Sequence, residues 1–578
     1  MLKPWWQQWP KRLGYELRQL RYAGISYKLD YESFRNGAGV LFLTIENEGP
    51  WKGLSLTARF PDIYPYTRFE IFCNDIVLDH HQHPFAKSLC LIGRASENWR
   101  TTDTIAKFLT ERLPNVISAG QSPGPGPAAS IIEEPQGEPF SDYYTYQEGS
   151  IVITNGAIHI PVDVNNGYID FVFGPQNGVN QFILHRISDE HGKILAENEP
   201  EYLQKKLSVS FRGKWIRRDS AVVSNNPDEF WAIIEKENEF LRTTEKAKIR
   251  ENVYVTMVGI VFPEEYSLRK SQDGWVFLLR VITRQNGKYT GRNHLVRAGY
   301  AGRNDLVQRV PFFSILQQKK IAVIGAGCLG GPSVLELARC GLGEIRMLDH
   351  DFLDPGTSVR WPFGLVAAGQ LKVLQLAKFI YDNYPFTKVV PIAYRLGVTS
   401  LATKKELTDI DVLNELLDGV DLIYDATTEL GIQHFLSDMA SARQIPYVGV
   451  STTHGAWGGI VVKISPENTA GCWNCYRNFI TENVDANPAK DDNGIIQPKG
   501  CGDVTYVGAG FDAQPVALEG VRSVISMLTS NSHDGYPSLG WDFAVLNLRD
   551  QNGYPIPPTW KTYKLQPHPN CRCTPKQK

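Results

Sequence analysis

The spacing of hydrophobic residues changes about halfway along the chain. In the first 300 residues most apolar positions fall in short strand-like runs, such as GVLFLTIEN, LSLTARF and RFEIFC. After about residue 306, strand-like and helix-like runs alternate. KKIAVIGAG precedes a helical pattern from Gly331 to Arg339, which is followed by the strand-like EIRMLDHD. This alternation predicts an α/β domain with a parallel sheet covered by helices.

Amino-acid composition divides the first 305 residues into separate regions. The first three strand-like runs are followed by an amphipathic pattern over Thr102 to Leu113, which predicts a compact α+β fold. A Pro-, Gly-, Ser- and Glu-rich stretch from Gln121 to Pro139 predicts a linker. Further strand-like runs follow, without a motif of recognisable chemistry. The expected division is an α+β domain at 1–120, a flexible linker at 121–144, a β-rich connector at 145–305 and an α/β domain at 306–578.

Length and charge exclude several classes of protein. The 578 residues suit three or four domains. With 60 Lys and Arg against 62 Asp and Glu, the net charge of −2 gives no argument for nucleic acid or a membrane surface. No apolar run is long enough for a transmembrane helix, and MLKPWWQQWP lacks the apolar core of a signal peptide. We therefore expect a cytoplasmic protein with neither a nucleic-acid nor a membrane partner.

A glycine loop marks a candidate nucleotide site. The sequence GAGCLG, with Gly325, Gly327 and Gly330, lies between a strand and a helix, where backbone N–H groups can hold a phosphate. This loop alone leaves NAD or FAD chemistry open. Acidic residues at strand ends and basic residues between them favour ATP with Mg²⁺, because carboxylates suit a ribose and a magnesium ion and cations suit a triphosphate. These residues are Asp349, Asp351, Arg360, Lys372 and Asp425.

In this order the motifs resemble the ThiF- and MoeB-like and ubiquitin-activating adenylation enzymes, over roughly 310–578. By role, the resemblance implies Asp349 or Asp351 for the ribose, Arg360 and Lys372 for the phosphates and Asp425 for magnesium. The chain departs from the family twice: the N-x-x-R-Q segment reads TSVRW, and the acidic–Asn pair after the last strand reads Thr428-Glu429. A Rossmann scaffold without nucleotide is the alternative.

Four cysteines have the spacing of a metal site. Cys472 and Cys475 form a C-x-x-C pair, and Cys571 and Cys573 lie near the end of the chain. Four thiolates in a tetrahedron bind a structural Zn²⁺, with His568 as an alternative ligand and unmetallated or redox thiols as the alternative state. The adenylation enzymes that the chain resembles often carry zinc at this place.

Two further cysteines are candidate nucleophiles. Cys501 lies in a Gly- and Asp-rich stretch before an apolar helix, a setting that favours a reactive thiol over an ordinary loop cysteine. Its surroundings resemble the catalytic-cysteine region of atypical activating enzymes. Cys90 belongs to a set that is similar to the ubiquitin-conjugating fold, in which Phe85 stands where that family has Asn. The matching positions are Tyr64-Pro65, His83-Pro84, Cys90-Leu91 and Trp99.

The remaining cysteines, Cys73, Cys328 and Cys340, are expected to pack in the interior.

The combination resembles the fused activating–conjugating enzymes of type II CBASS anti-phage operons. That resemblance implies that ATP activates the C-terminal carboxylate of a partner, the cyclic-nucleotide synthase called CD-NTase. Cys501 then takes the acyl group as a thioester and Cys90 passes it to an amine. It also implies a homodimer through the adenylation domain. The alternatives are a small bacterial ubiquitin-like protein as the carboxylate donor, a non-catalytic nucleotide-binding scaffold, an inert conjugating-type domain, and a redox enzyme.

Overall fold

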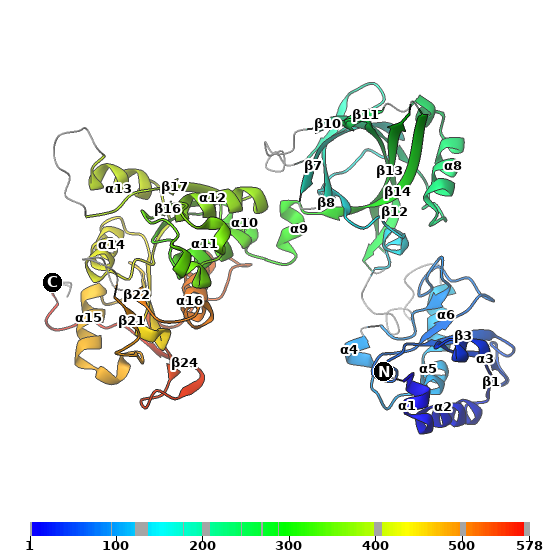
Figure 1. Cartoon of the computed structure of the whole chain (residues 1–578), viewed down its shortest axis with the longest axis horizontal. Coiled ribbons are helices and arrows are strands. Elements are labelled where there is room, and N and C mark those ends of the chain that lie inside the picture. Colours follow the sequence, from blue (N-terminus) through cyan, green and yellow to red (C-terminus); the bar gives the residue numbers. More distant parts are fainter. Residues whose placement is uncertain are drawn as a thin grey trace. The chain divides into compact units, whose positions relative to one another are not determined.

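The computed structural model describes residues 3–93, 95–121, 137–176, 179–198, 209–243, 246–267, 270–286, 288–397, 407–497 and 505–571. The chain forms two compact units (Figure 1). The first comprises Met1–Glu199 and Lys205–Tyr300 and contains a five-stranded and a nine-stranded sheet. The second comprises Pro200–Gln204 and Ala301–Lys578 and contains an eight-stranded sheet.

The five-stranded sheet is an antiparallel meander, each strand pairing with the next in the chain. Its strands are β1 (Ile25–Leu29), β2 (Gly39–Ile45), β3 (Ser55–Phe60), β4 (Glu70–Phe72) and β5 (Ser88–Leu89). Burial in β3 alternates, which places one face of the strand in the core. The helices around it are α1 (Trp5–Gln8), α2 (Pro10–Tyr22), α3 (Tyr31–Arg35), α4 (Ala95–Asn98), α5 (Ile105–Glu111) and α6 (Leu113–Gln121).

The helix expected over Thr102 to Leu113 begins later than predicted. Thr104 has an extended backbone and its hydroxyl accepts the N–H of Lys107, so α5 starts at Ile105. Trp5 and Tyr64 are completely buried in the core of this sheet. The Tyr64 hydroxyl donates to the buried Glu16 carboxylate, so the Tyr-Pro motif lies inside the fold.

The nine-stranded sheet closes into a barrel, because β10 pairs with both β7 and β12. Its strands are β6 (Ser150–Thr154), β7 (Asn166–Gln176), β8 (Val179–Asp189), β9 (Ile194–Glu197), β10 (Val209–Arg217), β11 (Ala247–Arg250), β12 (Val253–Ser267), β13 (Lys270–Gln285) and β14 (Lys288–Tyr300). Buried aromatic side chains, including Phe171, Trp215 and Phe277, pack together in one cluster. Helix α8 (Pro227–Glu237), capped by Asn226, contributes Phe230 and Ile234 to a second cluster.

The eight-stranded sheet of the second unit is mixed. In spatial order its strands are β17 (Lys388–Ile392), β16 (Glu344–Leu348), β15 (Lys320–Ile324), β18 (Leu422–Asp425), β19 (Tyr447–Thr452), β20 (Gly458–Ile464), β23 (Phe543–Arg549) and β24 (Pro555–Tyr563). The first five are parallel and the last three antiparallel. The expectation of a parallel sheet is therefore wrong for the last three strands. β19 and β20 are joined by a connection too short for a parallel crossover.

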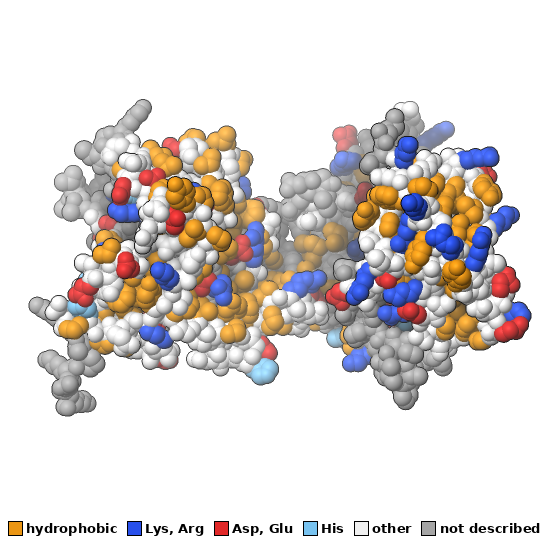
Figure 2. Space-filling view, turned by 90° about the horizontal axis from the view of Figure 1, so that it is seen from below, with side chains coloured by type: hydrophobic (Ala, Val, Ile, Leu, Met, Phe, Trp, Pro, Cys, Tyr) orange, Lys and Arg blue, Asp and Glu red, His pale blue; other side chains and the backbone are white. Residues whose placement is uncertain are grey.

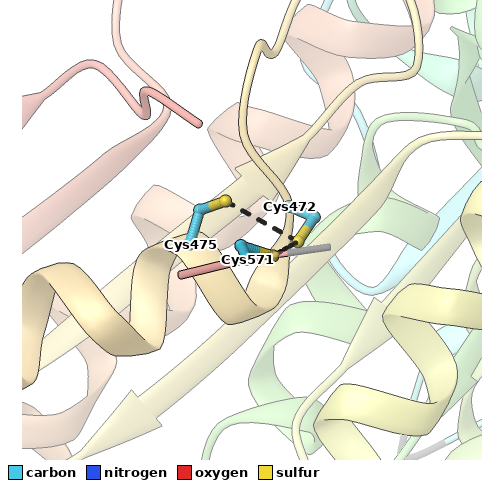
Figure 3. A group of neighbouring side chains, drawn as sticks. All are labelled: Cys472, Cys475 and Cys571. Carbon is cyan, nitrogen blue, oxygen red and sulfur yellow. Dashed lines mark hydrogen bonds between the residues drawn. The ribbon is translucent and has the colours of Figure 1, made fainter. Parts of the chain in front are cut away.

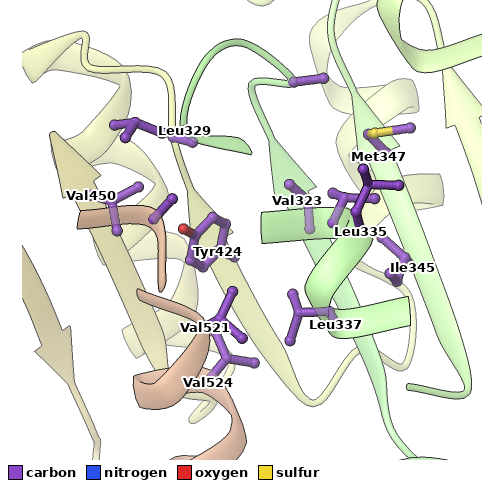
Figure 4. Packing of buried hydrophobic residues seen from close by; sticks show 14 of the residues in the cluster. Val323, Leu329, Leu335, Leu337, Ile345, Met347, Tyr424, Val450, Val521 and Val524 are labelled. Atoms are coloured by element: carbon purple, nitrogen blue, oxygen red, sulfur yellow. The ribbon is translucent and has the colours of Figure 1, made fainter. Parts of the chain in front are cut away.

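Helices cover both faces of this sheet. They are α11 (Gly330–Arg339), α12 (Lys372–Asn383), α13 (Asp409–Leu417), α14 (Leu430–Ala442), α15 (Trp473–Glu482) and α16 (Gly510–Thr529), and shorter helices include α9 (Arg303–Val307) and α10 (Phe313–Leu316). On one face, Leu337 of α11 and Val521 of α16 pack with Val323 and Tyr424 of the central strands (Figure 4). On the other, α13 and α14 pack on the same strands. The central strands are thus buried on both sides, as a parallel arrangement requires.

The surface mixes residue types. On the face drawn in Figure 2, apolar side chains lie among basic and acidic ones. In the part of the chain that the structure describes, no helix combines the length and the apolar character needed to cross a membrane.

Candidate functional site

The glycine loop lies at the carboxyl edge of three adjacent parallel strands. β15 lies between β16 and β18, and Ile324 is in register with Leu348 on one side and Asp425 on the other. The loop that follows Ile324 therefore lies beside the residues that end both neighbouring strands. This edge is where α/β sheets bind ligands.

Each glycine of the loop has a different steric role. Gly325 has a φ of +88°, and a Cβ there would approach the backbone of Ala426 to 2.8 Å. A Cβ on Gly330 would meet the Gly325 carbonyl oxygen at 1.9 Å, so only glycine lets α11 start against the loop. Gly327 has nothing within 4 Å of a Cβ position and borders open space. That space beside the amino terminus of α11 suits a phosphate group.

Two side chains hold the loop in place. The buried carboxylate of Asp349 accepts the backbone N–H of Ala326 at 2.6 Å and that of Asp351 at 2.7 Å. The indole N–H of Trp361 donates to the Ala326 carbonyl at 2.8 Å. Both backbone polar groups of Ala326 are therefore fixed. Asp349 acts on the shape of the loop, which leaves Asp351 as the more exposed of the two acids predicted to contact a ribose.

Asp351 and Lys372 form an ion pair at this edge. Lys372 Nζ lies 2.9 Å from Asp351 Oδ2, and His350 Nε2 lies 3.1 Å from Asp351 Oδ1. Burial raises the pKa of Asp351, but the hydrogen bond and charge of Lys372 outweigh burial and hold the pKa below its ordinary value. Asp351 is therefore a carboxylate at neutral pH that can accept hydroxyl groups, beside a cation suited to phosphate.

Asp425 is completely buried at the end of β18. Its Oδ1 accepts the backbone N–H and the hydroxyl of Thr427 at 2.9 and 2.7 Å, and its Oδ2 accepts the Tyr447 hydroxyl at 3.0 Å. Burial outweighs these hydrogen bonds and raises the pKa of Asp425 to about 6. The next carboxylate along the chain is Glu429, which is exposed.

Arg360 contacts the segment that follows the Cys501 region. Its guanidinium donates to the Thr505 hydroxyl at 2.6 Å and to the Tyr506 carbonyl, and it lies over the Tyr506 ring at 4.3 Å. The Tyr506 hydroxyl in turn lies 2.7 Å from the sulfur of Cys328 in the glycine loop. Cys328 is half-buried and packs against the core, as expected, and its sulfur has this polar contact as well. Tyr506, which the sequence did not single out, thus joins Arg360 to the nucleotide loop.

Three of the four predicted zinc ligands meet. The sulfurs of Cys472 and Cys475 lie 3.8 Å apart and those of Cys472 and Cys571 3.4 Å apart, with the three side chains converging in Figure 3. A tetrahedral zinc with Zn–S bonds of ~2.3 Å separates its sulfurs by about 3.8 Å, so the thiols fit this metal. Cys573, like Cys501, lies outside the described residues.

His568 is directed away from the three sulfurs. Its Nε2 lies 3.0 Å from a Glu482 oxygen, and its Nδ1 contacts the Asn478 side chain and the backbone N–H of Asn570. Its backbone N–H donates to the sulfur of Cys475 at 3.2 Å. His568 therefore supports the cluster through its backbone, and its ring has other partners.

Cys90 follows β5 and is half-buried. It lies beside His81, which is paired with Glu138. Phe85, which follows the His83-Pro84 pair, packs against Phe140 and Tyr144. Sequence reasoning missed His81 and Glu138. The run His80-His81-Gln82-His83 was the one available signal for the first, and Glu138 stands in the stretch that composition assigned to a linker.

The sheet topology and the glycine loop together define a Rossmann-like α/β domain, which we compared with known proteins. Residues 307–530 match the model of the ThiF family. The chain is 29% identical to the uncharacterized protein y4oA of Sinorhizobium fredii (strain NBRC 101917 / NGR234), over 98% of this chain and 97% of that protein. It is 27% identical to the adenylyltransferase and sulfurtransferase UBA4 of Yarrowia lipolytica (strain CLIB 122 / E 150), over 38% of this chain. The chain spans 49% of that relative, about half its length.

Among solved structures, E. coli MccB with ATP is similar at 15% identity, with a TM-score of 0.33 over 45% of this chain and 67% of that one. Residues 307–530 are therefore similar to the ThiF family, and part of the chain is similar to an adenylyltransferase.

Proposed function

We propose that the second unit adenylates the C-terminal carboxylate of a partner protein with ATP. The observation that carries the proposal is the meeting of the glycine loop, Asp351 with Lys372, and Asp425 at one sheet edge within the ThiF-type region. A carboxylate oxygen would attack the α-phosphorus, the bond to the β-phosphate would break, and pyrophosphate would leave. The acyl adenylate then has AMP as a good leaving group.

The residues have separate roles in this proposal. Asp351 accepts the ribose hydroxyls, Lys372 and Arg360 contact the phosphates, and Asp349 keeps the loop in its binding shape. For Arg360 to do so, it must exchange its contacts with Thr505 and Tyr506 for a phosphate. Magnesium, when bound, neutralises phosphate charge. A metal at Asp425 would replace a hydrogen bond from Thr427 or Tyr447, while Glu429 offers an exposed carboxylate in the same turn.

We further propose that the acyl group moves through two cysteines. Cys501 attacks the acyl carbon and releases AMP, and Cys90 accepts the acyl group by thiol exchange and presents it to an amine. This assigns a conjugating role to residues 1–120, which residues 121–305 join to the activating domain at 306–578. Linking both thiols in one protein raises their effective concentration.

For the donor we propose CD-NTase, with a ubiquitin-like protein as the alternative; both present a C-terminal carboxylate. We also propose that the second unit dimerises. Val359, Leu365, Val366 and Phe511 are highly exposed apolar residues, and we propose that a second copy covers them. Light scattering of the wild type and of Val366→Glu tests this: a dimer that the variant dissociates supports it, and a monomeric wild type contradicts it.

The relay is tested by co-expression of the chain with its neighbouring gene products, followed by non-reducing gels and intact-mass analysis. We compare wild type, Cys90→Ala and Cys501→Ala, with Cys73→Ala as a control because Cys73 is buried in the core of the same domain. The expected result is a thiol-sensitive adduct on Cys501 that persists in Cys90→Ala and is absent in Cys501→Ala. The mass of the adduct identifies the donor.

Two outcomes contradict parts of the proposal. An adduct on Cys90 without Cys501 would overturn the order of transfer. The absence of ATP-dependent pyrophosphate release with every neighbouring product would overturn adenylation itself.

A further inference from the structure

A short hairpin fixes His81 beside Cys90. Gln82 and Leu89 form an antiparallel bridge, and the backbone N–H of Cys90 donates to the His81 carbonyl at 2.8 Å. The His81 imidazole also forms a hydrogen bond with the Cys90 thiol. His81 has a φ of +62°, in the left-handed region that non-glycine residues seldom occupy. Such strained positions cluster at functional sites.

Glu138, which follows the amino-terminal sheet in the chain, binds His81 through both carboxylate oxygens. One carboxylate oxygen accepts the backbone N–H of His81 at 2.8 Å, and the other lies 2.9 Å from its Nδ1. The backbone N–H of Glu138 donates to Glu265 at 3.0 Å, and a Cβ on Gly137 would clash with the backbone of Tyr266 at 2.6 Å. The end of β12 therefore determines where Glu138 lies.

Each charged group near His81 has a partner of opposite charge or a hydrogen-bond partner. His81 has Glu138 and Cys90 as partners, while the neighbouring His80 pairs with Glu265 at 3.3 Å. The Tyr143 hydroxyl lies 3.4 Å from Glu138. Burial lowers the pKa of His81, but hydrogen bonds and charge from Cys90 and Glu138 outweigh burial and raise the pKa to about 10. Burial likewise raises the pKa of Glu138, and the bonds from His81 lower it below its ordinary value.

We propose that His81 and Cys90 form an imidazolium–thiolate pair that Glu138 holds in place. The thiolate is the reactive form of a cysteine, and the pair would place that form of Cys90 next to a proton donor. His81 touches the reacting sulfur and is a catalytic residue, whereas Glu138 is a positioning residue. The proposal deepens the conjugating role given to Cys90 above and rests on it for its substrate, a protein thioester.

The pair can serve both transfer steps. In thiol exchange, the Cys90 thiolate attacks the acyl carbon, the carbon–sulfur bond to the donor cysteine breaks, and the His81 imidazolium protonates the departing sulfur. In transfer to an amine, the nitrogen attacks the acyl carbon and the bond to Cys90 breaks. The neutral imidazole takes the proton that the amine loses, which restores the ion pair.

The arrangement also explains why Phe85 can replace the Asn of the conjugating family. Phe85 packs against Phe140 and Tyr144 and so helps dock the segment that carries Glu138. In place of a polar side chain, the chain has Phe85, whose contact with Phe140 helps position the Glu138 carboxylate. The alternative is that His81 and Glu138 only attach this segment to the sheet, without influence on the thiol.

Alkylation of Cys90 separates these possibilities without ATP or a partner. Full-length protein is treated with iodoacetamide from pH 5 to pH 9, and peptide mapping follows Cys90 alone. We compare wild type with His81→Gln and Glu138→Gln, and with His80→Gln as a control that removes a neighbouring imidazole paired with Glu265. At pH 6 we expect Cys90 in His81→Gln to react at least about 10-fold more slowly than in wild type and to recover near pH 8.5, the ordinary thiol pKa.

Glu138→Gln should fall between wild type and His81→Gln, and His80→Gln should follow wild type. If Cys90 in the wild type becomes reactive only near pH 8.5, that result alone would refute the proposed ion pair. Equal profiles for wild type and His81→Gln would do the same. Since the readout needs no acyl donor, a missing adduct in the co-expression experiment would refute the relay and leave this result unchanged.

Discussion

Replacing Asp425 by Asn should make the protein more stable while removing a group proposed for magnesium. Asp425 is completely buried, and burial raises its pKa to about 6 from an ordinary value of 3.8. Because the folded carboxyl binds its proton more tightly than the unfolded one, protonation favours the native state. This contribution to stability is fully present below pH 3.8 and is lost as the pH rises through 6.

The magnitude follows from the two pKa values. Their difference, from 3.8 to about 6, corresponds to about 3 kcal/mol at ~1.4 kcal/mol for each pKa unit. Asparagine keeps an oxygen for Thr427 and can donate to the Tyr447 hydroxyl, so the hydrogen bonds survive. We therefore expect Asp425→Asn to exceed the wild type in unfolding free energy by up to about 3 kcal/mol above pH 7, and by little below pH 4.

The assay is urea denaturation at intervals from pH 4 to pH 8. Hydrogen–deuterium exchange of peptides from β18 assigns the change to the second unit. Asp418→Asn, which changes an exposed carboxylate just after the end of α13, is the matched control and should not acquire this pH dependence. A stability difference that does not change with pH, or one that favours the wild type above pH 7, would refute the burial argument.

Three further outcomes are expected. Gly330→Ala should abolish ATP binding in calorimetry and lower the melting temperature, because its Cβ would lie 1.9 Å from a loop oxygen. Gly327→Ala should fold normally and bind ATP more weakly, and equal melting temperatures for the two variants would contradict this. Cys472→Ser should lose bound zinc, measured by elemental analysis, and about 2 kcal/mol or more of stability, with Cys73→Ser retaining the metal. Tyr506→Phe removes the hydrogen-bond partner of Cys328, so iodoacetamide should modify Cys328 faster, and an unchanged rate would contradict that contact.

Local pattern was enough to predict that the glycine loop and the strand-end acids share one sheet edge. A glycine loop between a buried strand and a helix, and acids directly after strands, are signals carried by neighbouring residues in the chain. Strand–helix alternation then predicts a common sheet edge, because parallel strands end on the same side. The C-x-x-C pair is likewise a local spacing, and it predicted where Cys472 and Cys475 lie relative to each other.

Contacts between distant segments required the tertiary structure. Periodicity does not reveal that β20, β23 and β24 run antiparallel, because a buried strand reads alike in either direction. Nor does it reveal that Tyr506 bridges Arg360 and Cys328, or that the ring of His568 faces Glu482 instead of the thiols.

The surroundings of Cys90 show most clearly which features the sequence predicts and which depend on the tertiary structure. The order of motifs around Cys90 could be identified from the sequence, but its partners depend on the packing of a second segment. Glu138 lies in a Pro- and Gly-rich stretch with no periodic hydrophobic signal, so composition predicted a linker there. Close packing of Gly137 on the end of β12 and of Phe140 on Phe85 brings its carboxylate to His81. Such contacts join residues far apart in the chain, and only the folded backbone determines which of them form.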